Sequence, residues 1–177
     1  MSALAETPAA LLPGGGLYAE VLTLLYREAD LLDSYRFAEW LEMMDPELTY
    51  TMPVRTSQFL TDGKGFDPKA TFFDDDLESL TTRVKRLETE FAWAETPPSR
   101  TRHFISNTIL EPCEEGEARA RSHFMVTRTR SDNGYQMFTG ERQDTLRRGE
   151  DGGLRFARRV ILPDQTTITA TNLSVFL

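Results

Sequence analysis

Cysteine and histidine are scarce in this sequence. Among 177 residues it has one cysteine, Cys113, and two histidines, His103 and His123. A Rieske iron–sulfur centre needs two cysteines and two histidines, and a cysteine-rich zinc site needs several thiolates, so this chain alone can build neither. A single cysteine also excludes an internal disulfide, which fits a reducing, cytoplasmic location.

Positive net charge, long apolar runs and phosphate-binding loops are missing as well. The net charge is −8 and the pI is about 4.9, whereas a nucleic-acid-binding protein needs a basic face to displace counterions. No apolar run approaches the roughly 20 residues that cross a bilayer. Residues 1–16 lack the basic start and apolar core of a secretion signal, and the glycines at 14–16 lack the strand and lysine of a phosphate loop. We therefore expect neither a nucleic-acid nor a membrane partner.

Two sets of residues are candidate metal ligands: the two histidines and three consecutive aspartates. A mononuclear iron site of two histidines and one carboxylate would need both His103 and His123. These residues fall on two expected strands and could meet, but two histidines on strands are a weak signal. The consecutive acids Asp74, Asp75 and Asp76 are better explained as the acidic first turn of a helix, because consecutive side chains point apart. We expect no metal site in this chain.

His103 is the strongest candidate for acid–base catalysis. It could serve as a general base inside a pocket, together with Tyr50 or an aspartate. Alternatively, it is a partly buried structural histidine that bonds to the backbone or to a carboxylate. The structural interpretation is favoured because the sequence places no acidic partner beside it. Cys113 has no basic neighbour to favour its thiolate and is expected to be inert.

Three groups of arginines stand out in this acidic chain. They are Arg100 with Arg102, Arg147 with Arg148, and Arg158 with Arg159. Charged side chains on solvated strand edges protect a sheet from aggregation. Arginine also suits ion pairs with a carboxylate-rich partner subunit. Both interpretations stay open from the sequence.

The first part of the chain is predicted to be mostly helical. Residues 1–16 are rich in alanine and proline and are expected to form a flexible N-terminal arm, with residues 17–177 as a single domain. Apolar residues recur at helical spacing over 17–32. Asp33 and Ser34 offer capping oxygens for a second helix, which Pro46 would end.

A strand, a long loop and a third helix are expected next. The strand covers 48–54 and the loop 56–71, where glycine and proline interrupt any periodicity. Asp75 and Glu78 form a capping-box-like start to the third helix. Its apolar stripe consists of Leu77, Leu80, Val84 and Leu87.

The remainder of the chain is predicted to form strands and turns. Strands are expected over 99–110, 118–130, 135–148 and 154–162, with a tight hairpin at Asn133-Gly134. In the first of them, simple alternation places Phe104, Ser106, Thr108 and Leu110 on one face. The apolar residues 173–177 either close the core or dock on a partner. Helices followed by an antiparallel meander indicate an α+β fold, with helices on one face of a curved, mostly antiparallel sheet.

Seven stretches of the sequence match a known family in order and spacing. They are FAEWL at 37–41, YTMPVR at 50–55, FDDD at 73–76 with LTTRV at 80–84, AWAE at 92–95, PPSRTRHFISN at 97–107, GERQDTLRR at 140–148 and NLSVFL at 172–177. Together they resemble the beta (small) subunit of bacterial aromatic-ring-hydroxylating dioxygenases, of the Rieske non-haem iron oxygenase family. The match runs from about residue 17 to residue 177.

The resemblance implies a cone-shaped, cystatin-like fold of the nuclear-transport-factor-2-like type, with a curved mixed sheet. It implies that three such chains assemble with three alpha subunits. The alpha subunit carries the Rieske [2Fe-2S] cluster and the mononuclear Fe(II) at which O2 and the arene meet in an NADH-dependent cis-dihydroxylation. A reductase, usually with a ferredoxin, supplies the electrons. The beta subunit is chiefly structural, with no catalytic, cofactor-binding or metal residues to carry over.

A second function is an alternative to the subunit role. The same cone fold also suits a stand-alone isomerase or dehydratase that uses His103 with Tyr50 in acid–base chemistry. A carboxylate facing His103 from inside the cone would favour this alternative.

Overall fold

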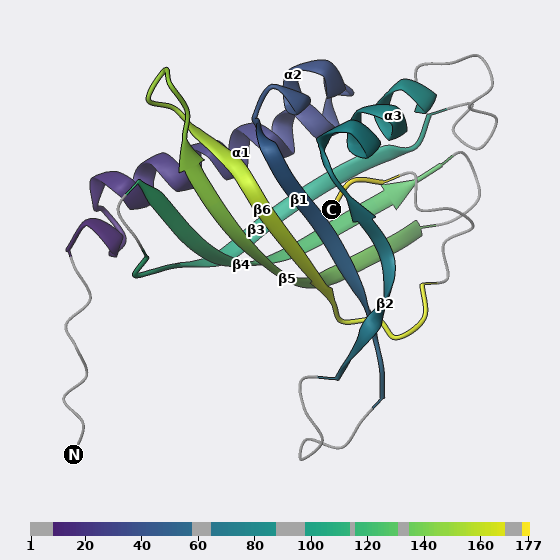
Figure 1. Cartoon of the computed structure of the whole chain (residues 1–177). Coiled ribbons are helices and arrows are strands. Elements are labelled where there is room, and N and C mark those ends of the chain that lie inside the picture. The colour runs from purple at the N-terminus through teal and green to yellow at the C-terminus, as the bar shows by residue number, and fades with distance from the viewer. Residues whose placement is uncertain (1–8, 58–64, 88–97, 114–115, 131–134, 169–174) are drawn as a thin grey trace, which may run out of the picture.

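Six strands form one open, mixed sheet in the computed structural model, which describes residues 9–57, 65–87, 98–113, 116–130, 135–168 and 175–177. The strand order is β2-β1-β6-β5-β4-β3 (Figure 1). Strands β1 and β6 run parallel, and the other neighbours run antiparallel. The strands are β1 (Met44–Arg55), β2 (Phe66–Asp75), β3 (Arg100–Glu111), β4 (Glu117–Thr129), β5 (Tyr135–Arg148) and β6 (Leu154–Pro163). This arrangement confirms the predicted α+β cone with a mostly antiparallel sheet.

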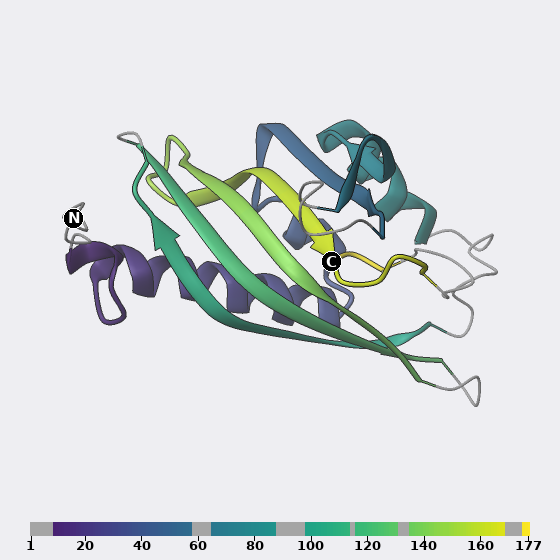
Figure 2. The ribbon, with the colours of Figure 1, turned by 90° about the horizontal axis from the view of Figure 1, so that it is seen from below.

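The long helix α1 (Gly16–Asp33) lies along β3 and confirms the helix predicted over 17–32 (Figures 1 and 2). Its residues Val21 and Leu25 are fully buried at helical spacing. The hydroxyl of Tyr18 donates to the main-chain oxygen of Thr108 at 3.2 Å, and Asp33 binds the opposite end of β3. The helix is thus tied to the strand near both of its ends.

The second helix is much shorter than the sequence suggests. Helix α2 (Phe37–Leu41) has five residues, and Arg36 rather than Asp33 or Ser34 precedes it. Pro46 does not end this helix, because it already lies in β1. The predicted capping by Asp33 is wrong because that carboxylate accepts hydrogen bonds from β3 instead.

Strand β2 replaces much of the predicted loop at 56–71. Residues 66–71 belong to this strand, which pairs with β1 at the edge of the sheet. Its register against β1 shifts twice, and its residues are mostly half-buried or exposed. An irregular edge strand leaves little apolar periodicity, so the sequence pattern could not reveal it. Residues 58–64 lie outside the described residues.

Helix α3 (Leu77–Leu87) has the predicted apolar stripe but a different cap. The N–H of Ser79 donates to Oδ1 of Asp76 at 2.8 Å, and the N–H of Asp76 donates to the hydroxyl of Ser79 at 2.9 Å. This reciprocal pair is a capping box. The predicted pair of Asp75 and Glu78 is therefore wrong by one residue, and Asp75 belongs to β2.

A bulge in β3 changes which of its side chains face the core. Ser106 pairs with His123 and Ile109 with Arg121, so two residues of β3 lie opposite one residue of β4. Asn107 takes the left-handed conformation there, with φ of 52°. The predicted simple alternation is therefore wrong beyond Ser106. The core-facing side chains of β3 are Thr101, His103, Ile105, Thr108 and Leu110.

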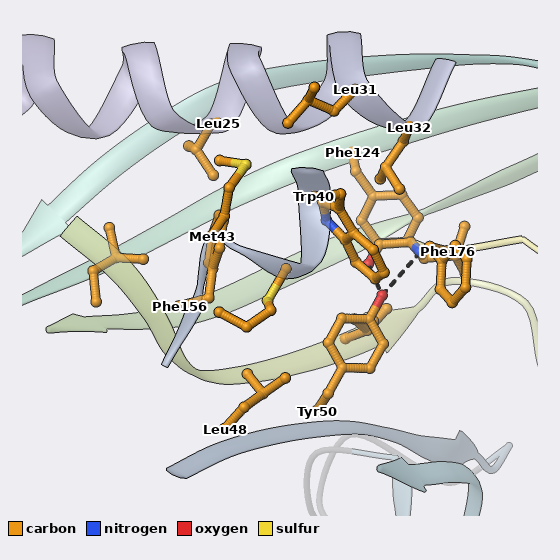
Figure 3. Close-up of a cluster of buried hydrophobic side chains, with 14 of the residues drawn as sticks. Leu25, Leu31, Leu32, Trp40, Met43, Leu48, Tyr50, Phe124, Phe156 and Phe176 are labelled. Carbon is orange, nitrogen blue, oxygen red and sulfur yellow. Dashed lines mark hydrogen bonds between the residues drawn. The ribbon is translucent and has the colours of Figure 1, made fainter. Parts of the chain in front are cut away.

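The last three residues complete the core. Val175, Phe176 and Leu177 are 4%, 4% and 1% exposed and belong to the main apolar cluster, which includes Trp40 (Figure 3). Of the two roles predicted for residues 173–177, closing the core is confirmed for 175–177, while residues 173–174 lie outside the described residues. The strands predicted over 118–130, 135–148 and 154–162 are confirmed as β4, β5 and β6. The predicted hairpin at 133–134 and the first eight residues of the predicted arm lie outside the described residues.

Within the described part of the chain, none of the helices has both the length and the apolar character that crossing a membrane requires.

Candidate functional site

His103 of β3 meets a carboxylate from the last residue of α1. Its Nδ1 is 2.6 Å from Oδ1 of Asp33, and the histidine side chain is 2% exposed. Thr101 donates to the same carboxylate through its hydroxyl at 2.9 Å, and the main-chain N–H of His103 donates at 3.0 Å. Burial alone would raise the pKa of Asp33, but the bonds from the His103 ring and backbone and from Thr101 hold it below its ordinary value. The sequence could not place this acidic partner, because 70 residues separate the two.

The second ring nitrogen of His103 is occupied by the chain itself. Nε2 is 2.9 Å from the main-chain oxygen of Phe176. The carboxylate of Asp33 and the carbonyl of Phe176 thus each face one nitrogen of the ring. In a working acid–base pair, the nitrogen opposite the carboxylate faces the substrate. Here that nitrogen binds Phe176, so His103 holds the C-terminal residues in place.

Tyr50, the other predicted member of a catalytic pair, binds Leu177, the residue after Phe176. Its hydroxyl donates to the main-chain oxygen of Leu177 at 2.5 Å and accepts from the N–H of Leu177 at 3.0 Å (Figure 3). Tyr50 is 1% exposed, and burial raises the pKa of its phenol. The fold therefore brings His103 and Tyr50 to consecutive residues of one segment, and both polar groups hold that segment.

Aromatic packing also holds the same segment. The ring of Phe176 lies with its centroid 4.5 Å from that of Trp40 and 5.6 Å from that of Phe37. The guanidinium of Arg83 lies 5.0 Å from the Phe176 ring centroid. We refer to residues 175–177 as the C-terminal tripeptide. It is buried in the core of the cone, between the polar groups of His103 and Tyr50.

A buried ionic network lies next to this tripeptide and was missed by sequence reasoning. Arg159 donates to both carboxylate oxygens of Glu28, at 2.6 and 2.9 Å, and to Asp144 at 2.7 and 3.1 Å. Arg142 donates to Glu28 at 3.3 Å, and Nε1 of Trp40 donates to it at 3.0 Å. All four charged side chains are at most 1% exposed.

The charged groups of this network shift one another's pKa values. Burial alone would raise the pKa of Glu28, but Arg159 and Arg142 hold it below its ordinary value. Burial alone would lower the pKa of Arg159, but Asp144 and Glu28 raise it well above its usual range. Each of the three guanidinium nitrogens of Arg159 donates to Glu28 or Asp144. The network has the properties of a structural ion cluster that docks α1 on β5 and β6.

The three predicted groups of arginines differ in their burial and in their ion-pair partners. Arg159 is buried in the ionic network, so neither of the interpretations made from the sequence applies to it. Arg147 pairs within the chain with Asp45 and Glu47, at 3.3 and 2.9 Å. Arg148 pairs with Glu20 at 2.8 Å. Arg148 remains exposed despite this pair, as are Arg100, Arg102 and Arg158.

The remaining candidates do not come together. His123 is exposed, and its Nδ1 accepts from the amide of Asn107 at 3.1 Å. His123 thus faces away from the core on β4, while His103 faces into it. Cys113 donates through its thiol to the main-chain oxygen of Glu117 at 3.0 Å. Among the described residues, no three or more side chains of His, Cys, Asp and Glu gather in a way that could hold a metal ion.

Comparison with known proteins decides the family. The family model described as the ring hydroxylating beta subunit matches residues 27–170. The chain is 39% identical to the beta subunit of benzene 1,2-dioxygenase from Pseudomonas putida, over 90% of this chain and 88% of the relative. It is 38% identical to the beta subunit of chlorobenzene dioxygenase from Cupriavidus and 37% identical to that of biphenyl dioxygenase from Rhodococcus jostii, with the same coverage of both chains. The chain belongs to the family of ring-hydroxylating dioxygenase beta subunits.

Solved structures show that this beta subunit shares its fold with both subunits and enzymes. A chain of naphthalene 1,2-dioxygenase superposes with a TM-score of 0.81 at 24% identity, covering 98% of this chain and 89% of the other. A protein described as a putative scytalone dehydratase from Novosphingobium aromaticivorans gives a TM-score of 0.65 at 16% identity, covering 88% and 89%. The fold alone therefore does not separate subunit from enzyme, whereas family membership does: the beta subunit is a non-catalytic part of a dioxygenase.

Proposed function

We propose that this beta subunit assembles the catalytic alpha subunits of an NADH- and O2-dependent dioxygenase that cis-dihydroxylates an arene. The expected assembly contains three alpha and three beta subunits in the cytoplasm. The alpha subunits hold the Rieske [2Fe-2S] cluster and the mononuclear Fe(II), and a ferredoxin and reductase supply electrons. Residues 17–177 form the assembling domain, residues 1–16 form an arm, and none of them is catalytic.

One observation carries the structural role. The two side chains best suited to acid–base work, His103 and Tyr50, both hydrogen-bond to the backbone of the C-terminal tripeptide. The carboxylate of Asp33 does face His103, as the alternative enzyme would require. However, Nε2 of His103, the nitrogen that would face a substrate, is bonded to the main-chain oxygen of Phe176. An isomerase or dehydratase would have to displace Phe176 and Leu177 before the ring nitrogen of His103 and the hydroxyl of Tyr50 could act on a substrate. The subunit role needs no such rearrangement.

The uncovered face of the sheet supplies apolar surface for assembly. Phe104 follows His103 in β3 and therefore points away from α1. Phe104, Tyr135 and Met137 are 51%, 63% and 47% exposed, and Phe104 pairs across the strands with Met125. Exposed apolar side chains that gather on one face are typical of a contact surface for another protein. We propose that neighbouring subunits of the oxygenase cover this face.

Co-expression with the alpha subunit tests the proposal. The full chain should co-purify with the alpha subunit in equal numbers, as measured by native mass spectrometry. Phe104→Asp should reduce that yield at least about tenfold, because it places a charge in the desolvated contact. Tyr26→Asp is the control, since Tyr26 is 55% exposed on α1. Equal yields from both variants would refute the assembling face.

The isolated chain gives the second arm of the test. We expect it to purify without iron and without oxygenase turnover, and the complex to have both. Stoichiometric iron with turnover in the isolated chain would refute the subunit role itself, independently of which face binds the partner.

A further inference from the structure

A pocket of about 280 Å³ remains open beside the C-terminal tripeptide. It lies where the end of α1, the start of α2, the end of α3 and the start of β3 meet. Its apolar wall consists of Leu32, Phe37, Leu87, Val175 and Phe176. Leu32, Val175 and Phe176 are at most 4% exposed, so they fix this wall within the core. The proposed role of the subunit makes no use of the pocket.

The polar groups of the pocket bond to the protein. The hydroxyl of Thr101 donates to Asp33 at 2.9 Å, and both ring nitrogens of His103 have partners. The hydroxyl of Tyr35 donates to the main-chain oxygen of Ser99 at 2.9 Å. A charged or strongly hydrogen-bonding ligand would lose its water without gaining comparable partners here. The pocket therefore selects for an uncharged, apolar ligand.

Size and ring geometry narrow the ligand further. An apolar protein cavity of about 150 Å³ is enough to bind benzene, so this pocket has room for one aromatic ring with small substituents. Phe37 and Phe176 already meet edge to face, with an interplanar angle of 63°. Tyr35 and Phe37 do the same at 77°. An aromatic ligand can extend this cluster through further edge-to-face contacts.

We propose that this pocket is a binding site for an uncharged single-ring arene. The site belongs to the beta subunit itself and does not depend on the alpha subunit. Its failure would leave the proposed subunit role intact, and the reverse also holds.

Fluorine NMR of fluorobenzene with the purified full-length chain tests the site. We expect saturable broadening of the fluorine signal, which unlabelled benzene reverses and benzoate at the same concentration does not. Leu87→Trp should abolish the broadening, because the indole fills the pocket. Lys85→Trp is the matched control, since Lys85 is exposed two residues earlier on the same helix, and it should keep the broadening.

A methyl chemical-shift titration of the unsubstituted chain with benzene keeps the test independent of any variant. The methyl groups of Leu32, Leu87 and Val175 should shift most. Absence of saturable broadening, equal broadening in Leu87→Trp, or largest shifts elsewhere in the molecule would overturn the site. Reversal by benzoate as effective as that by benzene would overturn its selectivity for uncharged rings.

Discussion

Arg158 and Arg159 are adjacent and chemically identical, yet they lie on opposite faces of β6. Arg158 is exposed, whereas Arg159 is 1% exposed and bound to Glu28 and Asp144. Simple alternation from Leu154 and Phe156 would put Arg158 inside. This is wrong because the pairing of β6 with β5 shifts register at Ala157, so that Arg159 faces the core instead. Charged residues are almost never fully buried unless paired, and their partners here come from α1 and β5, distant in sequence. The network was therefore invisible from local patterns.

Arg159→Met should cost about 3–5 kcal/mol of unfolding free energy, because it leaves the carboxylates of Glu28 and Asp144 buried without their shared counter-charge. Urea denaturation of the purified chain measures this loss. Arg158→Met is the matched control and should change the free energy by less than about 0.5 kcal/mol. Equal losses in the two variants would contradict the assigned network.

Asp33 predicts how stability changes in acid. Its folded-state pKa lies below the ordinary value of about 3.9. Its contribution is therefore fully present above that value and is lost as the pH falls through the lower folded-state pKa. Asp33→Asn should lower the unfolding free energy at neutral pH and flatten its decline in acid.

The control for Asp33 is Asp30→Asn, on the same helix with a side chain that is 70% exposed. Urea titrations at a series of pH values compare the two variants with the unsubstituted chain. An acid decline in Asp33→Asn as steep as in the unsubstituted chain would show that this carboxylate does not govern it.

At the scale of elements, the sequence predicts regular strands and long helices but not their irregularities. Helix α1 and strands β4, β5 and β6 follow from clear apolar periodicity and turn residues. Strand β2 was missed because an edge strand with two register shifts has no clean alternation. The prediction of which β3 side chains face the core was wrong beyond Ser106. The bulge there depends on pairing with β4, which no local pattern encodes. The His103–Asp33 contact follows from this packing of α1 on β3.

The bulge at Asn107 gives an element-scale prediction. Asn107→Val should cost about 1–2 kcal/mol, because a β-branched residue at a φ of 52° is strained. Asn107→Gly should be tolerated, since glycine takes that conformation freely. Ser106→Val, at the exposed neighbouring position, is the control and should stay within about 0.5 kcal/mol. Urea denaturation distinguishes them, and an unaffected Asn107→Val would argue against the bulge.

At the scale of the whole molecule, the C-terminal tripeptide fixes the interior of the cone. The cone places the side chains of His103, Asp33 and Tyr50 around its interior. The main-chain oxygens of Phe176 and Leu177 form hydrogen bonds with His103 and Tyr50. Trp40 and Phe37 pack on the ring of Phe176. The scarcity of metal ligands and the family resemblance pointed to the subunit role from the sequence. The occupation of the cone could not be predicted, because it joins residues more than 70 positions apart.

The most direct measurement is arene dihydroxylation per assembled complex after His103→Gln in the beta subunit, with His123→Gln as the matched control. His123 is the other histidine of the chain and is exposed on β4. We expect His103→Gln to lower the thermal stability of the beta subunit while leaving turnover per assembled complex within about twofold of the His123→Gln complex. A selective loss of turnover at full assembly, larger than about a hundredfold as for a missing general base, would contradict the structural role of His103 and of this chain.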